Sequence, residues 1–358
     1  MSTKPTYIKG DYRKSKFFNN ESRLVLGCSG LGGVWRPIEE KDAVETMMFA
    51  LEKGVRVFDT APSYNKSQLF LGKALREWSG EKPFISTKVG RLKADKADDC
   101  IVDYSPETMK KSVYESLDTL GLDTIDLLFL HEPHLVPIDK MDEIMECLNS
   151  FKKEGIVKSL GIGGNPIDRF YPYMVKKNFD VLSGFLKLDA CNISGFEKDI
   201  PQIQKENIGY YAASALHMGL LGRRLDQYNE ERPNNEWITN LDVDIALKVN
   251  EIAKKNNISL SRLALRYVFS MEEADRVVVG PSKMEQMIDY MRKFSEDEFV
   301  ELGLASWMHD VGKITTPEHV VDKEDKLQTI FKRFNLIEIR FELIAKNFEN
   351  NFLKQKIE

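Results

Sequence analysis

The chain has 358 residues, of which 42% are hydrophobic and 30% charged, and its formal net charge is −5. This composition is that of an ordinary folded protein and excludes a disordered or fibrous one. Acidic and basic residues are mixed along the whole length, which argues against nucleic acid as a partner, because nucleic-acid binders gather Lys and Arg on one surface. No apolar run approaches the ~18 residues of a membrane span, so no membrane partner is expected either.

The N-terminal residues 1–22 are basic but lack the apolar stretch of a signal peptide, and we interpret them as a short lead-in. The four cysteines, Cys28, Cys100, Cys147 and Cys191, lie far apart and form no Cys-x-x-Cys pair. Neither a disulfide framework nor a zinc site is expected from that spacing. Reduced thiols in a cytoplasmic protein are therefore the expectation.

From residue 23 onward, short apolar runs alternate with longer amphipathic stretches. The short runs are nearly continuous in apolar residues, as expected of parallel strands that are buried on both faces. The predicted strands are residues 23–26, 55–58, 84–87, 125–130, 157–162, 180–183, 208–212 and 276–279. Strands that alternate with helices favour a parallel sheet.

The stretches between the predicted strands have the 3.6-residue period of helices. Residues 41–52 carry one apolar stripe. Another helix begins with Ser105 as N-cap and Pro106 at its first position, and Gly121 ends it. Residues 260–267 are a further predicted helix.

An open Rossmann sheet and a closed barrel both fit this alternation, and the placement of polar residues decides between them. Asp59, Lys88 and His131 each follow a predicted strand directly, as does the turn at residues 163–165. Residues at the carboxyl ends of several successive strands converge only if the strands form a ring. The glycine-rich segment after the first strand also lacks the GxGxxG spacing of a dinucleotide-binding Rossmann unit. We therefore predict an α/β fold, a (β/α)8 TIM barrel.

The pattern continues beyond what a barrel needs. From Glu318 to the end there is neither glycine nor proline, and apolar residues recur at steps of three and four from Leu327 to Phe352. This is one apolar seam on a long helix or helix pair. We predict the barrel at residues 23–295 and a helical C-terminal extension at residues 296–358, which packs across the barrel or forms the contact of a homo-oligomer.

Four polar side chains fit one chemical task, the movement of a hydride to or from a carbonyl carbon. Each alone has an ordinary structural explanation as a cap, a packed ring or a surface charge. Together, Tyr64 would exchange the proton at the oxygen, although its solution pKa of ~10 is too high for easy exchange near neutrality. The ammonium of Lys88 would lower that pKa, Asp59 would hold the ammonium, and His131 would orient the substrate oxygen.

These residues, in the chain order Asp, Tyr, Lys and His, resemble the catalytic tetrad of the aldo-keto reductase family, and the similarity runs from about Arg23 to Tyr290. Residues 30–37 and 58–64, together with residues 214–221, resemble the sugar-oxidising branch of that family, the D-threo-aldose (L-fucose) and L-galactose 1-dehydrogenases. The resemblance implies a barrel with NAD or NADP extended across its C-terminal face and without a Rossmann unit.

The resemblance also implies which residues contact this cofactor. They are Asn165 near the nicotinamide carboxamide, Ser214, Leu216, Met218, Gly219 and Leu220 in the covering loop, and Gly280, Ser282, Lys283 and Gln286 at the adenosine phosphate end. Family members that prefer NADP have basic residues at the positions of Gly280 and Gln286. Neither is basic here, and a 2′-phosphate needs Arg or Lys. NAD is therefore favoured, while Lys283 keeps NADP open.

Trp35 and Arg36 follow the first strand, and we interpret them as substrate contacts, with a packed lid residue as the alternative for Trp35. The chain departs from the family at Gln68, where an acid is common, and at residues 185–188, which replace polar or aromatic partners. The prediction is an NAD(P)-dependent oxidoreductase acting at C1 of an aldose or related carbonyl compound, with Tyr64 as general acid/base. The alternatives are a general NADPH-dependent aldehyde reductase and a non-catalytic nucleotide-binding scaffold such as the potassium-channel β subunits.

Overall fold

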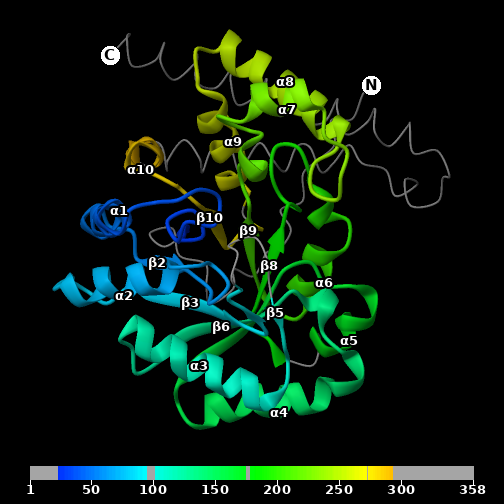
Figure 1. The fold of residues 1–358 in the computed structure, drawn as a ribbon. Coiled ribbons are helices and arrows are strands. Elements are labelled where there is room, and N and C mark those ends of the chain that lie inside the picture. Colours follow the sequence, from blue (N-terminus) through cyan, green and yellow to red (C-terminus); the bar gives the residue numbers. More distant parts are fainter. Residues whose placement is uncertain (1–22, 95–100, 175–177, 272, 293–358) are drawn as a thin grey trace, which may run out of the picture.

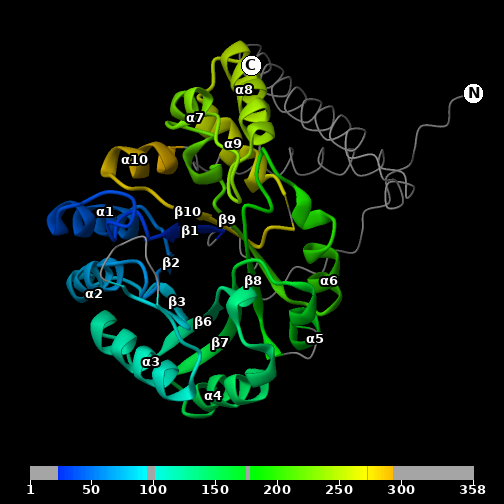
Figure 2. The same ribbon diagram turned by 45° about the vertical axis from the view of Figure 1, so that its right-hand side comes forward.

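The computed structural model describes residues 23–94, 101–174, 178–271 and 273–292. Parallel strands form a closed barrel in the order β1-β10-β9-β8-β7-β6-β3-β2, and the helices lie around it (Figures 1 and 2). The barrel strands are β1 (Leu24–Gly27), β2 (Val57–Asp59), β3 (Phe84–Val89), β6 (Ile125–His131), β7 (Val157–Gly163), β8 (Val181–Phe185), β9 (Gly209–Ala213) and β10 (Arg276–Val279). The predicted (β/α)8 barrel is confirmed, and each predicted strand boundary is correct to within two residues.

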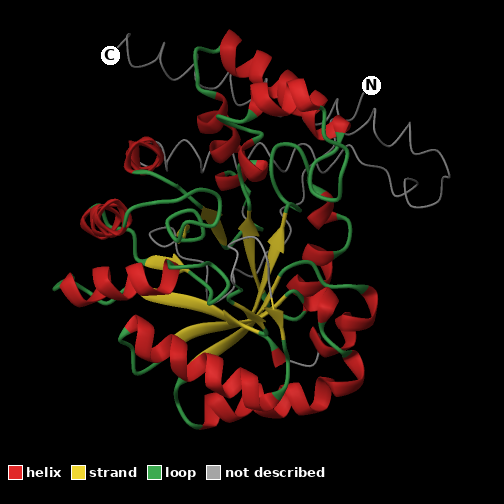
Figure 3. Cartoon of the chain, viewed as in Figure 1, coloured by secondary structure: helices red, strands yellow, loops and turns green. Residues whose placement is uncertain are grey.

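Helices follow most of the strands and pack on the outside of the barrel, as the red helices around the yellow strands in Figure 3 show. They are α1 (Glu40–Glu52), α2 (Ser67–Glu77), α3 (Pro106–Leu120), α4 (Met141–Lys153), α5 (Tyr171–Tyr173), α6 (Asp199–Lys205), α7 (Leu225–Glu231), α8 (Asn240–Lys255), α9 (Leu260–Phe269) and α10 (Met284–Arg292). None of the helices in the described part of the chain combines the length and the apolar character that crossing a bilayer requires.

The ends of α3 are those that its sequence predicts. The hydroxyl of Ser105 accepts a hydrogen bond from the backbone N–H of Thr108, and Pro106 occupies the first turn. Gly121 ends the helix with φ of 69°, a left-handed conformation that glycine adopts without the steric cost of a Cβ atom.

Side chains from the strands fill the inside of the barrel, so it is a packed core and not a pore. Phe129 and Tyr211 meet there edge to face, with ring centroids 5.9 Å apart. The guanidinium of Arg276 donates a 2.7 Å hydrogen bond to the Tyr211 hydroxyl and stacks on the ring of Phe84. The buried members of this inner cluster are Val25, Val57, Leu127, Phe129, Val181 and Tyr211.

The barrel closes where β1 meets β10, and Arg23 fastens this seam. Leu24 is in register with Val277. The buried guanidinium of Arg23 donates hydrogen bonds of 2.7–2.9 Å to the carbonyls of Phe269, Met271 and Ala274, at and beyond the end of α9. A cation at a helix C-terminus satisfies carbonyl groups that have no partner within the helix.

The antiparallel pair β4 (Arg91–Leu92) and β5 (Ile101–Val102) is not among the predicted elements. Two predicted segments lie outside the residues that the structure describes: the lead-in at residues 1–22, and the extension at residues 296–358 with its oligomer contact.

Candidate active site

Asp59 and Lys88 form a buried ion pair at the carboxyl ends of neighbouring strands. The Nζ atom of Lys88 lies 2.5 Å from Oδ2 of Asp59 and donates a 2.9 Å hydrogen bond to the carbonyl of Thr60. The hydroxyl of Ser86 donates to the other Asp59 oxygen at 2.7 Å. Burial lowers the pKa of Lys88, but Asp59 and Tyr64 outweigh that effect and raise this pKa above its ordinary value. The ammonium therefore stays charged at neutral pH.

The strands that carry Asp59, Lys88 and His131 reach one or two residues further than predicted at this rim. Asp59 ends β2 and His131 ends β6, instead of following these strands as loop residues. His131 is still in register with Gly163 of β7. Backbone pairing with the neighbouring strands fixes these side chains, which holds the site more rigidly than loop positions would.

Tyr64 lies in the turn after β2, half-buried, with the Lys88 ammonium 4.8 Å from the centroid of its ring. Burial is the largest influence on the pKa of Tyr64 and raises it; Lys88 lowers it and Asp59 raises it. Lys88 lowers the pKa as expected, but burial of the phenol outweighs the attraction of an ammonium that is already paired with Asp59, so the net shift is upward. The phenol is protonated at neutral pH, which is the form that a proton donor needs.

His131 is buried beside Tyr64 with a free ring nitrogen. The two rings meet edge to face, with centroids 6.1 Å apart and an interplanar angle of 82°. Burial is the main cause that lowers the pKa of His131 well below its ordinary value, and Lys88 and Arg91 lower it further. Its Nδ1 atom has no hydrogen-bond partner among the described residues. A neutral imidazole with an open nitrogen can form a hydrogen bond to a substrate oxygen.

The glycine-rich loop after β1 packs against the turn that carries Tyr64. A Cβ atom on Gly32 would lie 2.2 Å from the carbonyl oxygen of Tyr64, and Lys66 donates its N–H to the carbonyl of Gly32 at 3.2 Å. A Cβ atom on Gly30 would lie 2.7 Å from the carbonyl oxygen of Pro281. The two glycines thus bring this loop into contact with the Tyr64 turn and with the turn after β10.

The loop after β9 and the turn after β10 meet at Ser282. Ser214 and Met218 have φ of 65° and 52°, and the Ser214 hydroxyl accepts the N–H of Met218 at 3.1 Å. Directly after this loop, the exposed Arg223 donates to the hydroxyl of Ser282 at 3.3 Å. The other predicted cofactor residues of this loop are Leu216, Gly219 and Leu220. The structure therefore joins the two segments that were predicted to hold the cofactor.

Two side chains of the β10–α10 turn already have partners. The Oε1 atom of Gln286 accepts the N–H of Ser282 at 2.7 Å, so Gln286 holds the turn. The ammonium of Lys283 lies 3.2 Å from the carboxylate of Glu285 in an exposed ion pair. Gly280 approaches Gly27 of β1 closely at the seam of the barrel.

Asn165 bridges the ends of β7 and β8. Its amide donates to the carbonyl of Phe185 at 2.8 Å and accepts the N–H of the same residue at 2.9 Å. The side chain therefore fixes the end of β8, and it retains one N–H and one lone pair for a further partner.

A sequence comparison identifies the family. The profile described as "Aldo/keto reductase family" matches residues 23–305. This chain belongs to the aldo-keto reductase family. The L-galactose dehydrogenase of Arabidopsis thaliana is 30% identical over 287 residues, which are 77% of this chain and 85% of that protein. The D-threo-aldose 1-dehydrogenase of a Pseudomonas species is 26% identical over 290 residues, which are 74% and 86% of the two chains.

The fold comparison agrees. The holo form of an aldo-keto reductase from Bacillus halodurans has a TM-score of 0.63 and 26% sequence identity, covering 78% of this chain and 90% of that one. The predicted similarity to the family and to its sugar-oxidising branch is confirmed. The protein is an NAD(P)-dependent oxidoreductase.

The two predicted substrate residues of this aldo-keto reductase differ in their surroundings. Trp35 is 60% exposed. Arg36 donates a 2.6 Å hydrogen bond to the carbonyl of Ser282 and thus reaches the turn after β10. Arg36 therefore contributes to the region predicted for the cofactor.

The contacts of two residues near the site of this aldo-keto reductase were not predicted from the sequence. Arg223 lies beside Ser282, although no pattern marks it apart from its position after the covering loop. Gln68 bridges β3 and α3, since its amide nitrogen donates at 2.9 Å to the hydroxyls of both Thr87 and Ser116. The Ser116 hydroxyl already donates to the carbonyl of Ser112 at 2.8 Å, so it can only accept from position 68, which a glutamine amide satisfies and a carboxylate does not.

Proposed function

We propose that this aldo-keto reductase transfers a hydride between a nicotinamide and C1 of an aldose, with Tyr64 as the general acid/base. The observation that carries the proposal is the cluster of a protonated phenol, a paired ammonium and a neutral imidazole at one rim of the barrel. The relatives' printed names, L-galactose dehydrogenase and D-threo-aldose 1-dehydrogenase, support the substrate class.

When bound, the nicotinamide accepts or donates the hydride, and the protein's own residues handle the proton. In oxidation, the oxygen of Tyr64 takes the proton of the anomeric hydroxyl while the C1–H bond breaks and the C1–O bond becomes double. In reduction, the Tyr64 hydroxyl donates that proton to the carbonyl oxygen. Lys88, held by Asp59, stabilises the negative charge that develops on the Tyr64 oxygen, and an N–H or lone pair of His131 orients the substrate oxygen.

We propose NAD as the preferred cofactor, held by the covering loop and by the β10–α10 turn. Gly280 and Gln286 carry no positive charge, and the charge of Lys283 is paired with Glu285. Arg223, exposed beside the Ser282 hydroxyl, fits the phosphates that both cofactors share. Asn165 keeps hydrogen-bonding capacity for the carboxamide.

A turnover assay tests the substrate and the cofactor together. We expect absorbance of the reduced nicotinamide to grow when purified protein is mixed with NAD and a 6-deoxy or threo-configured aldose, and to grow more slowly with NADP. A protein that oxidises no aldose but consumes NADPH with simple aldehydes would contradict the proposal and would instead be a general aldehyde reductase. Tight nucleotide binding without turnover would indicate a nucleotide-binding scaffold.

The direction of the pKa shifts predicts opposite pH dependences for the two reactions. The pKa of Tyr64 is raised above 10, and oxidation needs the deprotonated phenol. At pH values below this pKa, the deprotonated fraction increases about tenfold with each pH unit. We expect log kcat/KM for oxidation to rise with a slope near one between about pH 7 and 9. Reduction uses the protonated form and should stay flat there. The pKa of His131 is lowered, so His131 does not titrate in this pH range. Steady-state kinetics of oxidation that do not change with pH would contradict the assignment of Tyr64 as the general base.

A further inference from the structure

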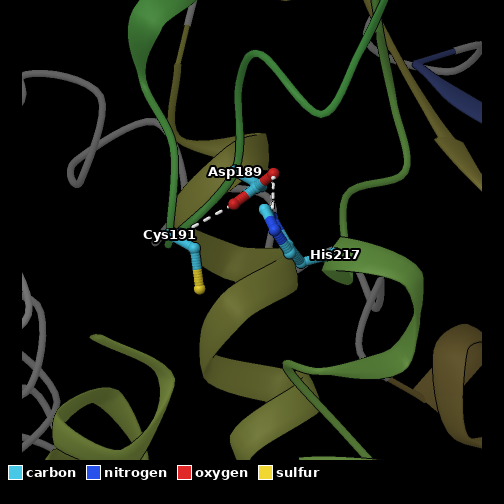
Figure 4. A group of neighbouring side chains, drawn as sticks. All are labelled: Asp189, Cys191 and His217. Atoms are coloured by element: carbon cyan, nitrogen blue, oxygen red, sulfur yellow. Dashed lines mark hydrogen bonds and ion pairs between the residues drawn. The ribbon is translucent and has the colours of Figure 1, made fainter. Parts of the chain in front are cut away.

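Three metal-binding side chains meet outside the tetrad, between two loops at the rim of the barrel. Asp189 and Cys191 belong to the loop after β8, and His217 belongs to the loop after β9 (Figure 4). All three are buried, and one ligand atom of each lies within 4.8 Å of those of the other two. We propose that Asp189, Cys191 and His217 bind one zinc ion, with a solvent molecule as the fourth ligand.

The donor set matches the chemistry of zinc. Thiolate, imidazole and carboxylate are its usual protein ligands, at about 2.0–2.3 Å. Tetrahedral ligand atoms at such bond lengths are about 3.4–3.7 Å apart, so the present side chains need to move by about 1 Å or less. One thiolate and one carboxylate neutralise the two charges of the ion, which makes the loaded site electrically neutral in a buried position.

A plain buried ion pair explains only part of this cluster. The Nδ1 atom of His217 lies 2.9 Å from Asp189 Oδ2, which satisfies those two atoms. It leaves the Nε2 atom of His217 buried without a hydrogen bond among the described residues, and the nearest carboxylate oxygen, of Asp242, is 3.9 Å away. The thiol of Cys191 takes no part in that pair and donates a weak hydrogen bond to the carbonyl of Asp242 at 3.6 Å. With the ion on Nδ1, the proton of His217 moves to Nε2, which faces the Asp242 carboxylate 3.9 Å away, and the thiolate becomes a ligand.

The surroundings supply the supporting contacts and the access that a metal site requires. The second oxygen of Asp189 accepts the N–H groups of Cys191 and Asn192 at 2.7 and 3.0 Å, which fixes the carboxylate. Cys191 and His217 line a cavity of about 410 Å³, together with Asp242. This cavity gives the ion a path and gives the fourth ligand room.

The site joins the loop after β8 to the loop that carries Ser214 and Met218. Its ligands are separate from the tetrad, so zinc binding does not depend on whether the proposed reaction is correct. Metal binding must displace the proton that His217 shares with Asp189 and the proton of the Cys191 thiol. Zinc affinity should therefore rise with pH.

Cobalt spectroscopy tests the site directly. Cys100 lies outside the described residues and is replaced by Ser in every sample, so that the remaining thiols are those known to be buried. After removal of metal by a chelator, the full-length chain is titrated with Co²⁺. We expect one ion per chain, an intense thiolate-to-cobalt band in the near ultraviolet, and displacement by Zn²⁺. Absence of stoichiometric binding would overturn the proposal.

Matched variants assign the ligands. Cys191→Ser should abolish the band and weaken zinc binding by more than the roughly 10–100-fold typical of changes around the ligands, and His217→Gln should also lose tight binding. Cys147→Ser, which changes another buried thiol on α4, should leave both unchanged. Tyr64→Phe should bind zinc normally. An unchanged band in a folded Cys191→Ser protein would overturn the proposal.

One further measurement needs no variant of a proposed ligand, so it tests the site even if those variants do not fold. Zinc-edge X-ray absorption of the Cys100→Ser, Cys147→Ser protein should report one sulfur at about 2.3 Å and nitrogen or oxygen ligands at about 2.0–2.2 Å. A shell of nitrogen and oxygen alone would overturn the assignment of Cys191.

Discussion

Replacing Tyr64 by Phe is expected to lower turnover by about 10²–10⁴-fold while the dissociation constant of the nicotinamide cofactor stays the same. The substitution removes only the hydroxyl that exchanges the proton. The ring remains to pack against the Lys88 ammonium and the edge of His131. Steady-state kinetics in both directions and a fluorescence titration with NADH measure the two effects separately.

Tyr114→Phe is the matched control for this prediction. Tyr114 is also a tyrosine with a bonded hydroxyl, but it is 51% exposed and donates to Glu154 on the surface. Its activity should equal that of the unmodified protein. Full turnover in the Tyr64→Phe protein would remove Tyr64 from the mechanism, and loss of cofactor binding would indicate a disturbed fold.

Replacing Lys88 by Met is expected to cost both stability and activity. It leaves the carboxylate of Asp59 buried without its cation, and breaking a buried pair in this way typically costs about 3–5 kcal/mol. It also removes the charge that stabilises the developing Tyr64 phenolate, so the remaining turnover should fall by at least about 10²-fold. Urea denaturation measures the first effect, and kinetics on the folded fraction measure the second.

The control is Lys73→Met, which breaks an ion pair of the same length at the surface. The ammonium of Lys73 lies 2.5 Å from the carboxylate of Glu40, and the two side chains are 37% and 48% exposed. Exposed pairs contribute about 0–1 kcal/mol. Equal losses of stability in the two variants would show that burial of the Asp59–Lys88 pair has no energetic consequence.

The fold was predictable because the barrel strands are buried on both faces, so that each strand appears in the sequence as a nearly continuous apolar run. Convergence of Asp59, Lys88 and His131 followed from their places at strand ends, which a ring brings together. The β4–β5 pair was not predictable, since Ile101 and Val102 are largely exposed and form too short a run.

Other parts of the site depend on distances that the sequence does not contain. The direction of the Tyr64 pKa shift results from a balance between burial and the Lys88 charge, and only coordinates give that balance. The cysteine spacing gave no reason to expect a zinc site. Asp189 and His217 are 28 positions apart and meet only because two successive strands place their loops side by side.

The seam between β1 and β10 can form only late in the synthesis of this chain. Arg23 contacts the carbonyl of Phe269, 246 positions later, so its partner is translated about 12–50 s after it. During that interval β1 has an unpaired edge, the kind of surface that invites association with other nascent chains. Products of translation that stop before β10 would keep that edge open and would be natural clients of chaperones and proteases.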